Sequence, residues 1–142
     1  MRLQTQILRQ VEHEFEKAGA LGYRSYEVLV ALMQADGQQL RLSDLAAQVG
    51  LSRSGLTRMV DRLERDGLLR RDRSAHDGRG IYALLNEAGR EAVRKAWPTY
   101  QACVEHWLGR NLDGPDRDDL RQICRKLLKI TDRTLESQEF WD

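Results

Sequence analysis

The feature that most constrains this chain is a pair of short amphipathic helix patterns separated by a glycine, within residues 42–66. Ser43 is a suitable N-cap for the first helix, and Ser52, just after the break at Gly50, is suitable for the second. The apolar positions are Leu45, Ala46 and Val49 in the first helix, and Leu56, Met59, Val60 and Leu63 in the second. This spacing gives each helix one buried face and predicts a helix-turn-helix, whose second helix enters the DNA major groove.

The other side of the second helix is polar and basic. Between residues 52 and 79, eight arginines stand against five acidic residues, a net charge of +3 in a chain whose total is +1. Arginine binds a phosphate or a guanine edge through two parallel bonds, and no lysine occurs in the segment. A solvated helix face with ion pairs such as Asp61–Arg65 and Arg58–Asp61 is the alternative. Because the arginines coincide with the positions expected to face the groove, we favour a polyanionic partner.

A basic hairpin is expected after the second helix. Gly67 suits the position that follows a helix C-terminus. Extended segments are expected at 68–73 and 79–85, with turn-forming residues at 74–78 between them. Asn86 then suits the N-cap of another helix. A helix-turn-helix followed by a basic hairpin is a winged helix.

Residues 42–89 resemble the core of the multiple-antibiotic-resistance regulator (MarR) family of bacterial transcription factors. The family pattern is Asp-x-Arg, five residues, Leu-Thr, two residues and Gly, which matches Asp77-Gly78-Arg79 and then Leu85-Asn86-Glu87-Ala88-Gly89. Asn86 replaces the usual Thr, and both are good N-cap residues. Gly55 stands where the family more often has Thr or Ala. The resemblance implies that Arg79 enters the minor groove while Asp77 holds its side chain.

The helix pattern and the resemblance together predict a set of residues that contact double-stranded DNA. The set is Ser43, Arg53, Ser54, Thr57, Arg58, Arg62, Arg73, Asp77 and Arg79. The expected function is sequence-specific transcriptional regulation, usually repression, at a pseudo-palindromic operator. A winged-helix module that binds only proteins is the alternative, but it has no reason to keep Arg53, Arg58 and Arg79.

The expected architecture is one mainly α-helical domain with a small β-hairpin. Its parts are a winged-helix core at about 24–85 and further helices at about 2–18, 87–109 and 116–138, within a single domain of residues 1–142. In the last helix, Leu120 and Ile123 belong to an apolar stripe expected to face inward. A winged helix does not need these terminal helices, so they most simply form a two-fold homodimer interface. A larger monomeric core is the alternative.

Five aromatic residues are expected at the junction of the winged helix and the terminal helices. They are Phe15, Tyr23, Tyr26, Trp97 and Tyr100. In the MarR family, effectors lodge between these two regions, and they are often aromatic acids or phenols. The resemblance therefore implies release from DNA by a small aromatic ligand that these residues line. Ordinary core packing is the alternative, because aromatic stripes at helical spacing usually pack in a core.

Other function classes have little support in the sequence. The motifs of phosphate-binding loops, serine hydrolases and zinc proteases are absent, so we expect neither an enzyme nor a cofactor. Cys103 and His106 have ligand-like spacing but no further partners, so no metal site is expected. A thiol-based redox sensor remains an alternative, although neither Cys103 nor Cys124 lies in the N-terminal helical region that the family's redox sensors use. No apolar run approaches the ~20 residues that span a bilayer, and we expect a cytoplasmic location without membrane contact.

Overall fold

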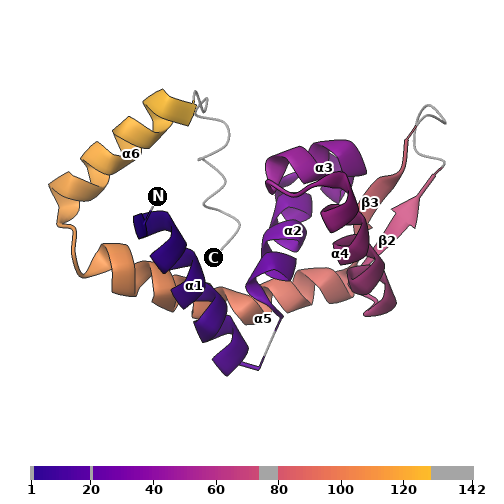
Figure 1. Ribbon diagram of the computed structural model, residues 1–142, viewed down its shortest axis with the longest axis horizontal. Helices are drawn as coiled ribbons and strands as arrows, with labels where there is room; N and C mark the ends of the chain where they lie inside the picture. The colour runs from indigo at the N-terminus through magenta and orange to yellow at the C-terminus, as the bar shows by residue number, and fades with distance from the viewer. Residues whose placement is uncertain (1, 20, 74–79, 129–142) are drawn as a thin grey trace. The chain divides into compact units, whose positions relative to one another are not determined.

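The computed structural model describes residues 2–19, 21–73 and 80–128 (Figure 1). In chain order the elements are α1 (Arg2–Lys17), α2 (Tyr23–Gln34), a 3-10 turn (Asp36–Gln38), β1 (Gln39–Arg41), α3 (Leu42–Gln48), α4 (Arg53–Arg65), β2 (Leu69–Asp72), β3 (Tyr82–Leu85), α5 (Glu87–Val104), a π-helical turn (Glu105–Gly109) and α6 (Gly114–Leu128). This mainly helical fold with a small antiparallel sheet confirms the predicted fold class. The chain divides into two compact units, residues 1–103 and 104–142.

The first unit is built around α2, which contributes more buried residues than any other described helix. Val28, Leu29 and Leu32 of α2 are fully buried. Such a helix lies at the centre of a core, because apolar side chains occupy most of its circumference. The predicted inward face of α4 is confirmed at its buried residues, Leu56, Val60 and Leu63, whereas Met59 is only half-buried.

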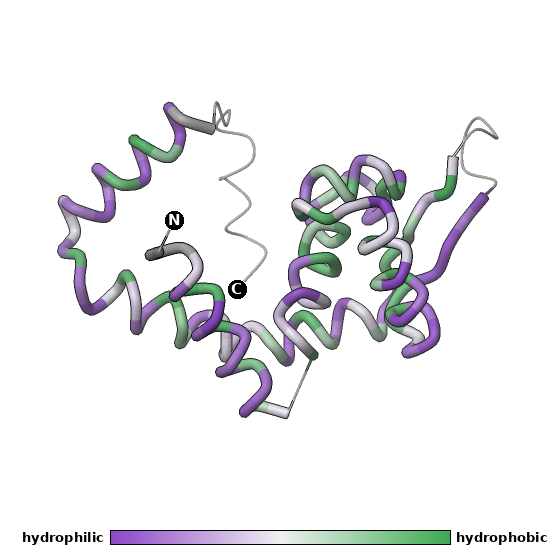
Figure 2. Tube along the Cα trace, in the orientation of Figure 1, coloured by the Kyte–Doolittle hydropathy of each residue, from purple (hydrophilic) through white to green (hydrophobic). Residues whose placement is uncertain are grey.

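The sheet has the order β1-β3-β2, and both pairs of strands are antiparallel. Strands β2 and β3 pair as the two strands of the predicted hairpin, and we call residues 69–85 the wing. Both strands are shorter than the expected segments 68–73 and 79–85. Figure 2 shows β2 hydrophilic along most of its length and β3 largely hydrophobic. Strand β1, which pairs Arg41 with Tyr82 of β3, was not expected from the sequence.

Three of the predicted helix ends are confirmed. The Ser52 hydroxyl accepts a hydrogen bond from the backbone N–H of Gly55 at 3.1 Å and caps α4. Gly67 follows the C-terminus of α4 with φ +73°, a conformation that glycine adopts without strain. The Asn86 side chain accepts a bond from the N–H of Gly89 at 2.9 Å and donates one to the Gly67 carbonyl at 2.7 Å. Asn86 therefore both caps α5 and fastens it to the end of α4.

The predicted N-cap at Ser43 is wrong. Helix α3 begins one residue earlier, at Leu42, and Arg41 occupies the cap position without a side-chain hydrogen bond. The reason is that β1 runs directly into α3. The N–H of Leu42 donates to the carbonyl of Ile81, so the sheet satisfies one of the first-turn amides that have no partner within the helix.

The start of α5 packs closely against the segment that follows α4. A Cβ atom added to Gly89 would lie 2.1 Å from the Leu68 carbonyl oxygen and 2.6 Å from a methyl carbon of Leu85. Real Cβ atoms do not approach so closely, so only glycine fits at this crossing. Gly89 is the last residue of the pattern that carries the family resemblance.

The second unit is helical in its described part. The amide of Arg110 donates to the carbonyl of Glu105, which closes the π-helical turn. Helix α6 starts at Gly114 rather than at the expected Asp116. The reason is a reciprocal cap: the Asp113 carboxylate accepts from the N–H of Asp116 at 2.8 Å, and the Asp116 carboxylate accepts from the N–H of Asp113 at 3.2 Å.

The apolar stripe of α6 is exposed. Leu120 retains 38% of its accessible surface and Ile123 retains 52%. The expectation that both face inward is therefore wrong for the described chain.

Candidate nucleic-acid interface

The polar side of α4 is available to a partner. Its predicted contact residues, Arg53, Ser54, Thr57 and Arg58, are all exposed, while the buried face fixes the rotation of the helix. The Thr57 hydroxyl donates to the Arg53 carbonyl at 2.8 Å, which orients its methyl group and oxygen on the surface. Within the described part of the chain, the guanidinium groups of Arg53 and Arg58 form no ion pair. Both arginines can therefore bind phosphate or base edges without breaking an internal contact.

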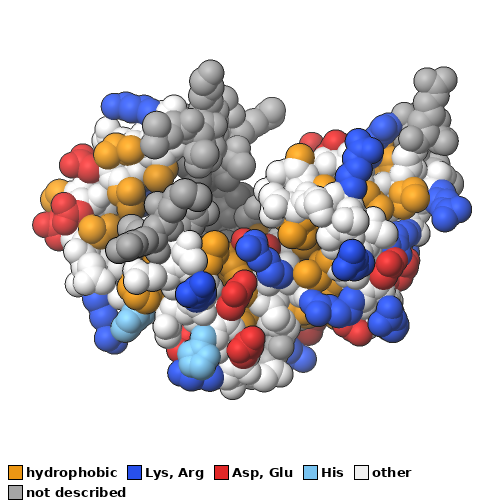
Figure 3. Space-filling view, in the orientation of Figure 1, with side chains coloured by type: hydrophobic (Ala, Val, Ile, Leu, Met, Phe, Trp, Pro, Cys, Tyr) orange, Lys and Arg blue, Asp and Glu red, His pale blue; other side chains and the backbone are white. Residues whose placement is uncertain are grey.

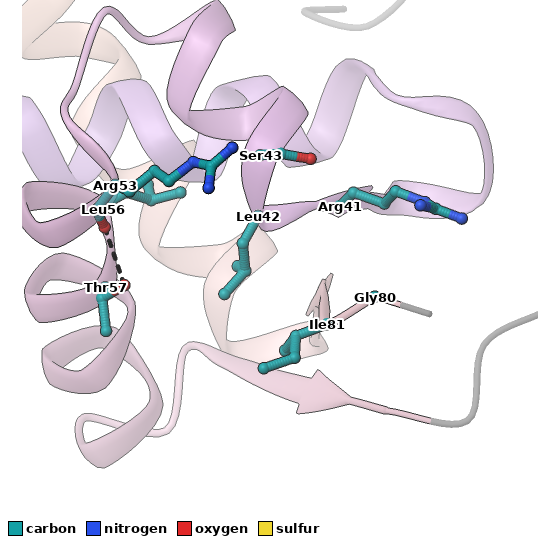
Figure 4. A pocket seen from close by; sticks show the side chains of 8 residues that line it. All are labelled: Arg41, Leu42, Ser43, Arg53, Leu56, Thr57, Gly80 and Ile81. Atoms are coloured by element: carbon teal, nitrogen blue, oxygen red, sulfur yellow. Dashed lines mark hydrogen bonds between the residues drawn. The ribbon is translucent and has the colours of Figure 1, made fainter. Parts of the chain in front are cut away.

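A surface hollow of about 300 Å³ lies beside the start of α4 (Figure 4). It brings together Ser43, Arg53 and Thr57, three of the predicted DNA-contacting residues. Figure 4 shows the Arg53 side chain extending toward Ser43. The remaining lining residues are Arg41, Leu42, Leu56, Gly80 and Ile81. The hollow thus joins α3, α4 and the residues that lead into β3.

Arg41 belongs to this surface and was missed by the sequence analysis. Its Nε donates to the Tyr82 hydroxyl at 2.7 Å, and its guanidinium carbon lies 5.4 Å from the centre of the Tyr82 ring. Both contacts depend on the pairing of β1 with β3, which brings together residues 41 positions apart. A three-residue strand has too little alternation to be recognised from its sequence.

A second arginine, Arg71 of β2, is bonded to α4. Its guanidinium donates to Asp61 and to Glu64, each at 2.5 Å, and its backbone N–H donates to Glu64 at 2.7 Å. The backbone and side-chain bonds lower the pKa of Glu64. Burial alone would lower the pKa of Arg71, but its hydrogen bonds to Asp61 and Glu64 raise it. The acidic residue Asp61 therefore pairs with Arg71 of the wing. The alternative interpretation had expected it to pair with Arg58 or Arg65.

Arg62 also has an internal partner. Its guanidinium donates to the hydroxyl of Ser25 in α2 at 2.7 Å and lies 3.4 Å from the Met59 sulfur. Ser25 is 2% exposed, so this bond satisfies a buried polar group. The contact holds α4 against α2 and directs the end of Arg62 toward that helix.

The wing carries the remaining predicted DNA contacts. Arg73 is exposed just after β2, and Arg70 is exposed within it. Asp77 and Arg79 lie outside the described residues. Figure 3 shows basic side chains spread over the region of α3, α4 and the wing, with acidic side chains among them.

The five predicted ligand-lining residues form one aromatic cluster. Phe15 packs against Tyr23 and Tyr26 with ring centroids 5.5 and 5.3 Å apart. Tyr100 continues the cluster, 5.5 Å from Tyr26 and 5.7 Å from Trp97. Phe15 is fully buried, and Tyr26 is 3% exposed. Burial raises the pKa values of Tyr23, Tyr26 and Tyr100, so these phenols stay neutral.

Other kinds of site find little support among the described residues. They include no group of three or more metal-ligating side chains. Cys103 is buried, and burial raises the pKa of its thiol, which disfavours the reactive thiolate. Cys124 is exposed. None of the helices in the described ranges is long and apolar enough to cross a membrane.

Comparisons with known proteins point to one family. A model of the MarR family matches residues 21–81. The chain is 31% identical, over 94% of its length and 74% of the relative's, to transcriptional repressor MprA of Escherichia coli K12. It is similar to Sco3205, a MarR family regulator from Streptomyces coelicolor solved with DNA, at 26% identity and a TM-score of 0.77, over 89% of this chain and 79% of that one. CouR of Rhodococcus jostii RHA1, solved with p-coumaroyl-CoA, gives 25% identity and a TM-score of 0.75, over 92% and 89%.

Proposed function

Because this chain belongs to the MarR family of DNA-binding transcriptional regulators, we propose that it represses transcription as a homodimer on a pseudo-palindromic operator. The exposed side of α4 carries this proposal. Arg53 and Arg58 are exposed there, and Thr57 and Ser43 lie beside Arg53 around one hollow. A helix with such a face, held by a buried core, fits the major groove.

The homodimer gives the operator its symmetry. In the second unit, Leu108, Leu120 and Ile123 are exposed apolar residues, which a second copy of the chain would cover. The operator is then an inverted repeat whose half-sites are about 34–36 Å apart, one turn of B-DNA. A repressor of this kind would act on the chromosome, in the cytoplasm.

The wing adds contacts to the backbone and the minor groove. Arg73 is exposed just after β2 and would bind a phosphate. For Arg79 and Asp77 the proposal rests on the family pattern alone: Arg79 enters the minor groove, and Asp77 restricts its rotamers. A narrow A·T-rich groove attracts such an arginine through its enhanced negative potential.

A small aromatic ligand would release the protein from DNA. The aromatic cluster of Phe15, Tyr23, Tyr26, Trp97 and Tyr100 joins α1, α2 and α5 within the first unit. CouR was solved with p-coumaroyl-CoA, which contains an aromatic acyl group. A ligand that enters the cluster would move α2, and through the bond between Ser25 and Arg62 it would also move α4.

The test is selection of bound sequences from a random pool of double-stranded DNA, followed by affinity measurements on the selected site. We expect an inverted repeat to be enriched. Arg58→Ala should weaken binding to that site, and Arg79→Ala should weaken it most where the flanks are A·T-rich. Lys95→Ala, an exposed change on α5, is the control and should have no effect. Failure to enrich any sequence would support a winged helix that binds proteins instead.

A further inference from the structure

We propose that Arg71 is a positioning residue, which holds the wing in its DNA-binding orientation by bridging Asp61 and Glu64 of the recognition helix α4. The inference rests on the proposed function, because it concerns how two DNA-contacting elements are held together. Arg71 needs no contact of its own with DNA for this role.

The geometry of the bridge restrains both partners. One guanidinium nitrogen of Arg71 donates to Glu64, and another donates to Asp61 and lies 3.4 Å from the Thr57 carbonyl. The N–H of Arg71 also donates to Glu64, so the backbone of β2 is held as well as the side chain. The Arg71 side chain is only 20% exposed, which reduces screening by solvent. These bonds hold β2, the first strand of the wing, against α4.

The charges of α4 make the bridge necessary for DNA binding. Asp61 and Glu64 follow Thr57 by four and seven residues, so they share its side of the helix. Free carboxylates on that side would face the phosphates that border the groove and would repel them. Arg71 offsets this repulsion and uses the same carboxylates to anchor the wing. Two acidic residues on a DNA-facing helix are thereby accounted for.

The bridge requires arginine rather than any cation. A guanidinium presents several donors in a fixed plane and can bond two carboxylates at once, whereas an ammonium group is a point charge. Arg70, the neighbouring residue in β2, makes only a 3.5 Å contact with Asp72 and is 62% exposed. Arg70 therefore serves as a matched control that has the same charge but no bridge.

The first experiment removes the carboxylates. In the full-length protein, Asp61→Asn together with Glu64→Gln deletes two negative charges from a DNA-facing helix. If charge alone mattered, affinity for the selected operator would rise. The bridge predicts the opposite, a loss on the order of tenfold, because the wing is released. Asp66→Asn, at the end of α4 and without a side-chain bond in the described part of the chain, is the control and should not weaken binding. An unchanged or higher affinity of the double variant overturns the proposal.

The second experiment tests the shape of the cation. Arg71→Lys keeps the charge, so an electrostatic role predicts wild-type affinity, whereas the bridge predicts a loss close to that of Arg71→Gln. Arg70→Gln should have a smaller effect than Arg71→Gln. Hydrogen exchange should accelerate at the β2 and β3 amides of both Arg71 variants while the α2 amides stay protected. Acceleration throughout the first unit would instead indicate general unfolding and would count against a positioning role, as would wild-type affinity of Arg71→Lys.

The two levels of the proposal fail in different ways. If Arg58→Ala weakens operator binding but the Asp61/Glu64 double variant and Arg71→Lys do not, the positioning role is wrong and the DNA-binding face stands. If the wild-type protein selects no DNA sequence, the proposed function fails first. In that case, unaltered hydrogen exchange in Arg71→Lys would show that the bridge does not restrain the wing either.

Discussion

The two units of this chain differ in how far they bury their apolar side chains. The largest fully buried side chains, from Phe15 to Val93, all belong to the first unit. The large hydrophobic residues that stay exposed in the described chain, Val104, Leu108, Leu120 and Ile123, all belong to the second. Figure 3 shows this apolar surface along α6. The first unit has a core of its own, whereas the second presents exposed apolar side chains, which a second copy would cover in the proposed dimer.

This difference separates two requirements for operator binding. The exposed side of α4 is held by the core of the first unit alone, so one protomer can form a half-site contact. Specific affinity for an inverted repeat needs two such contacts at a fixed spacing. The second unit supplies that spacing in the proposed dimer. Changes in the two units should therefore have different consequences, and the following predictions compare them.

The largest effect is expected from charging the exposed stripe of α6. Leu120→Asp together with Ile123→Asp should produce a monomer, because it places two charges in the exposed apolar surface that forms the proposed interface. Operator affinity should fall about a hundredfold or more, since the half-site energies no longer combine. Sedimentation and DNA titration test this, with the exposed change Asp119→Asn as control. A double variant that remains dimeric at micromolar concentration would show that the interface lies elsewhere.

A glycine-to-alanine change should lower the free energy of unfolding in the first unit but not in the second. Gly89→Ala in the first unit places a Cβ against the Leu68 carbonyl, so the crossing of α5 must open, at a cost of about 1–3 kcal/mol. At Gly109 the three atoms nearest to the added Cβ all belong to the side chain of Glu105, which is exposed and can move. Gly109→Ala should be neutral or stabilising by up to about 1 kcal/mol, because alanine favours a helix. Urea unfolding of both variants tests the pair, and equal destabilisation would contradict it.

The two units also differ in how much of their structure could be predicted from the sequence. Local patterns predicted several features of the first unit: the spacing of Leu56, Val60 and Leu63 indicated the buried face of α4, and Ser52 and Asn86 were found as caps because capping depends on nearby residues. The exposed stripe of α6 was assigned inward, since periodicity identifies an apolar face but does not say which chain covers it.

Contacts between distant segments were not predictable. The pairing of Arg41 with Tyr82 depends on β1, a strand of three residues, and its charge alone did not distinguish it from other arginines. Arg71 lies within the arginine-rich segment, but the only partners that the sequence suggested for Asp61 were Arg58 and Arg65 of its own helix, in the alternative interpretation. Composition located the basic surface correctly, whereas the partners of individual arginines required the fold.

Removing an exposed arginine should weaken operator binding only if the arginine lies in the first unit. Arg58→Ala should weaken operator binding, and its preference over other sequences, by about 1–3 kcal/mol, the value of a good bidentate contact with guanine. If Arg58 contacts a base, the dependence of operator affinity on salt concentration should stay the same. If it contacts a phosphate, that dependence should become weaker. Arg110→Ala, in the second unit and exposed, should alter neither quantity. Titration at several salt concentrations decides this, and unchanged site preference in Arg58→Ala would mean that α4 is rotated differently on the DNA.

The smallest expected effects come from the helix caps, and they sharpen the comparison most directly. Ser52→Ala removes the cap of α4 and should lower the free energy of unfolding by about 1 kcal/mol in both the wild-type background and the monomeric Leu120→Asp/Ile123→Asp background. Asp113→Ala removes the reciprocal cap of α6 at a similar cost, but that cost should fall on the dimer. In the monomeric background it should leave the unfolding transition of the first unit unchanged, because that unit's core includes no residue of α6. Urea titrations of the two variants in both backgrounds make the measurement. If Asp113→Ala destabilises the first unit of the monomer as much as Ser52→Ala does, the two units fold as one, and the comparison between them does not hold.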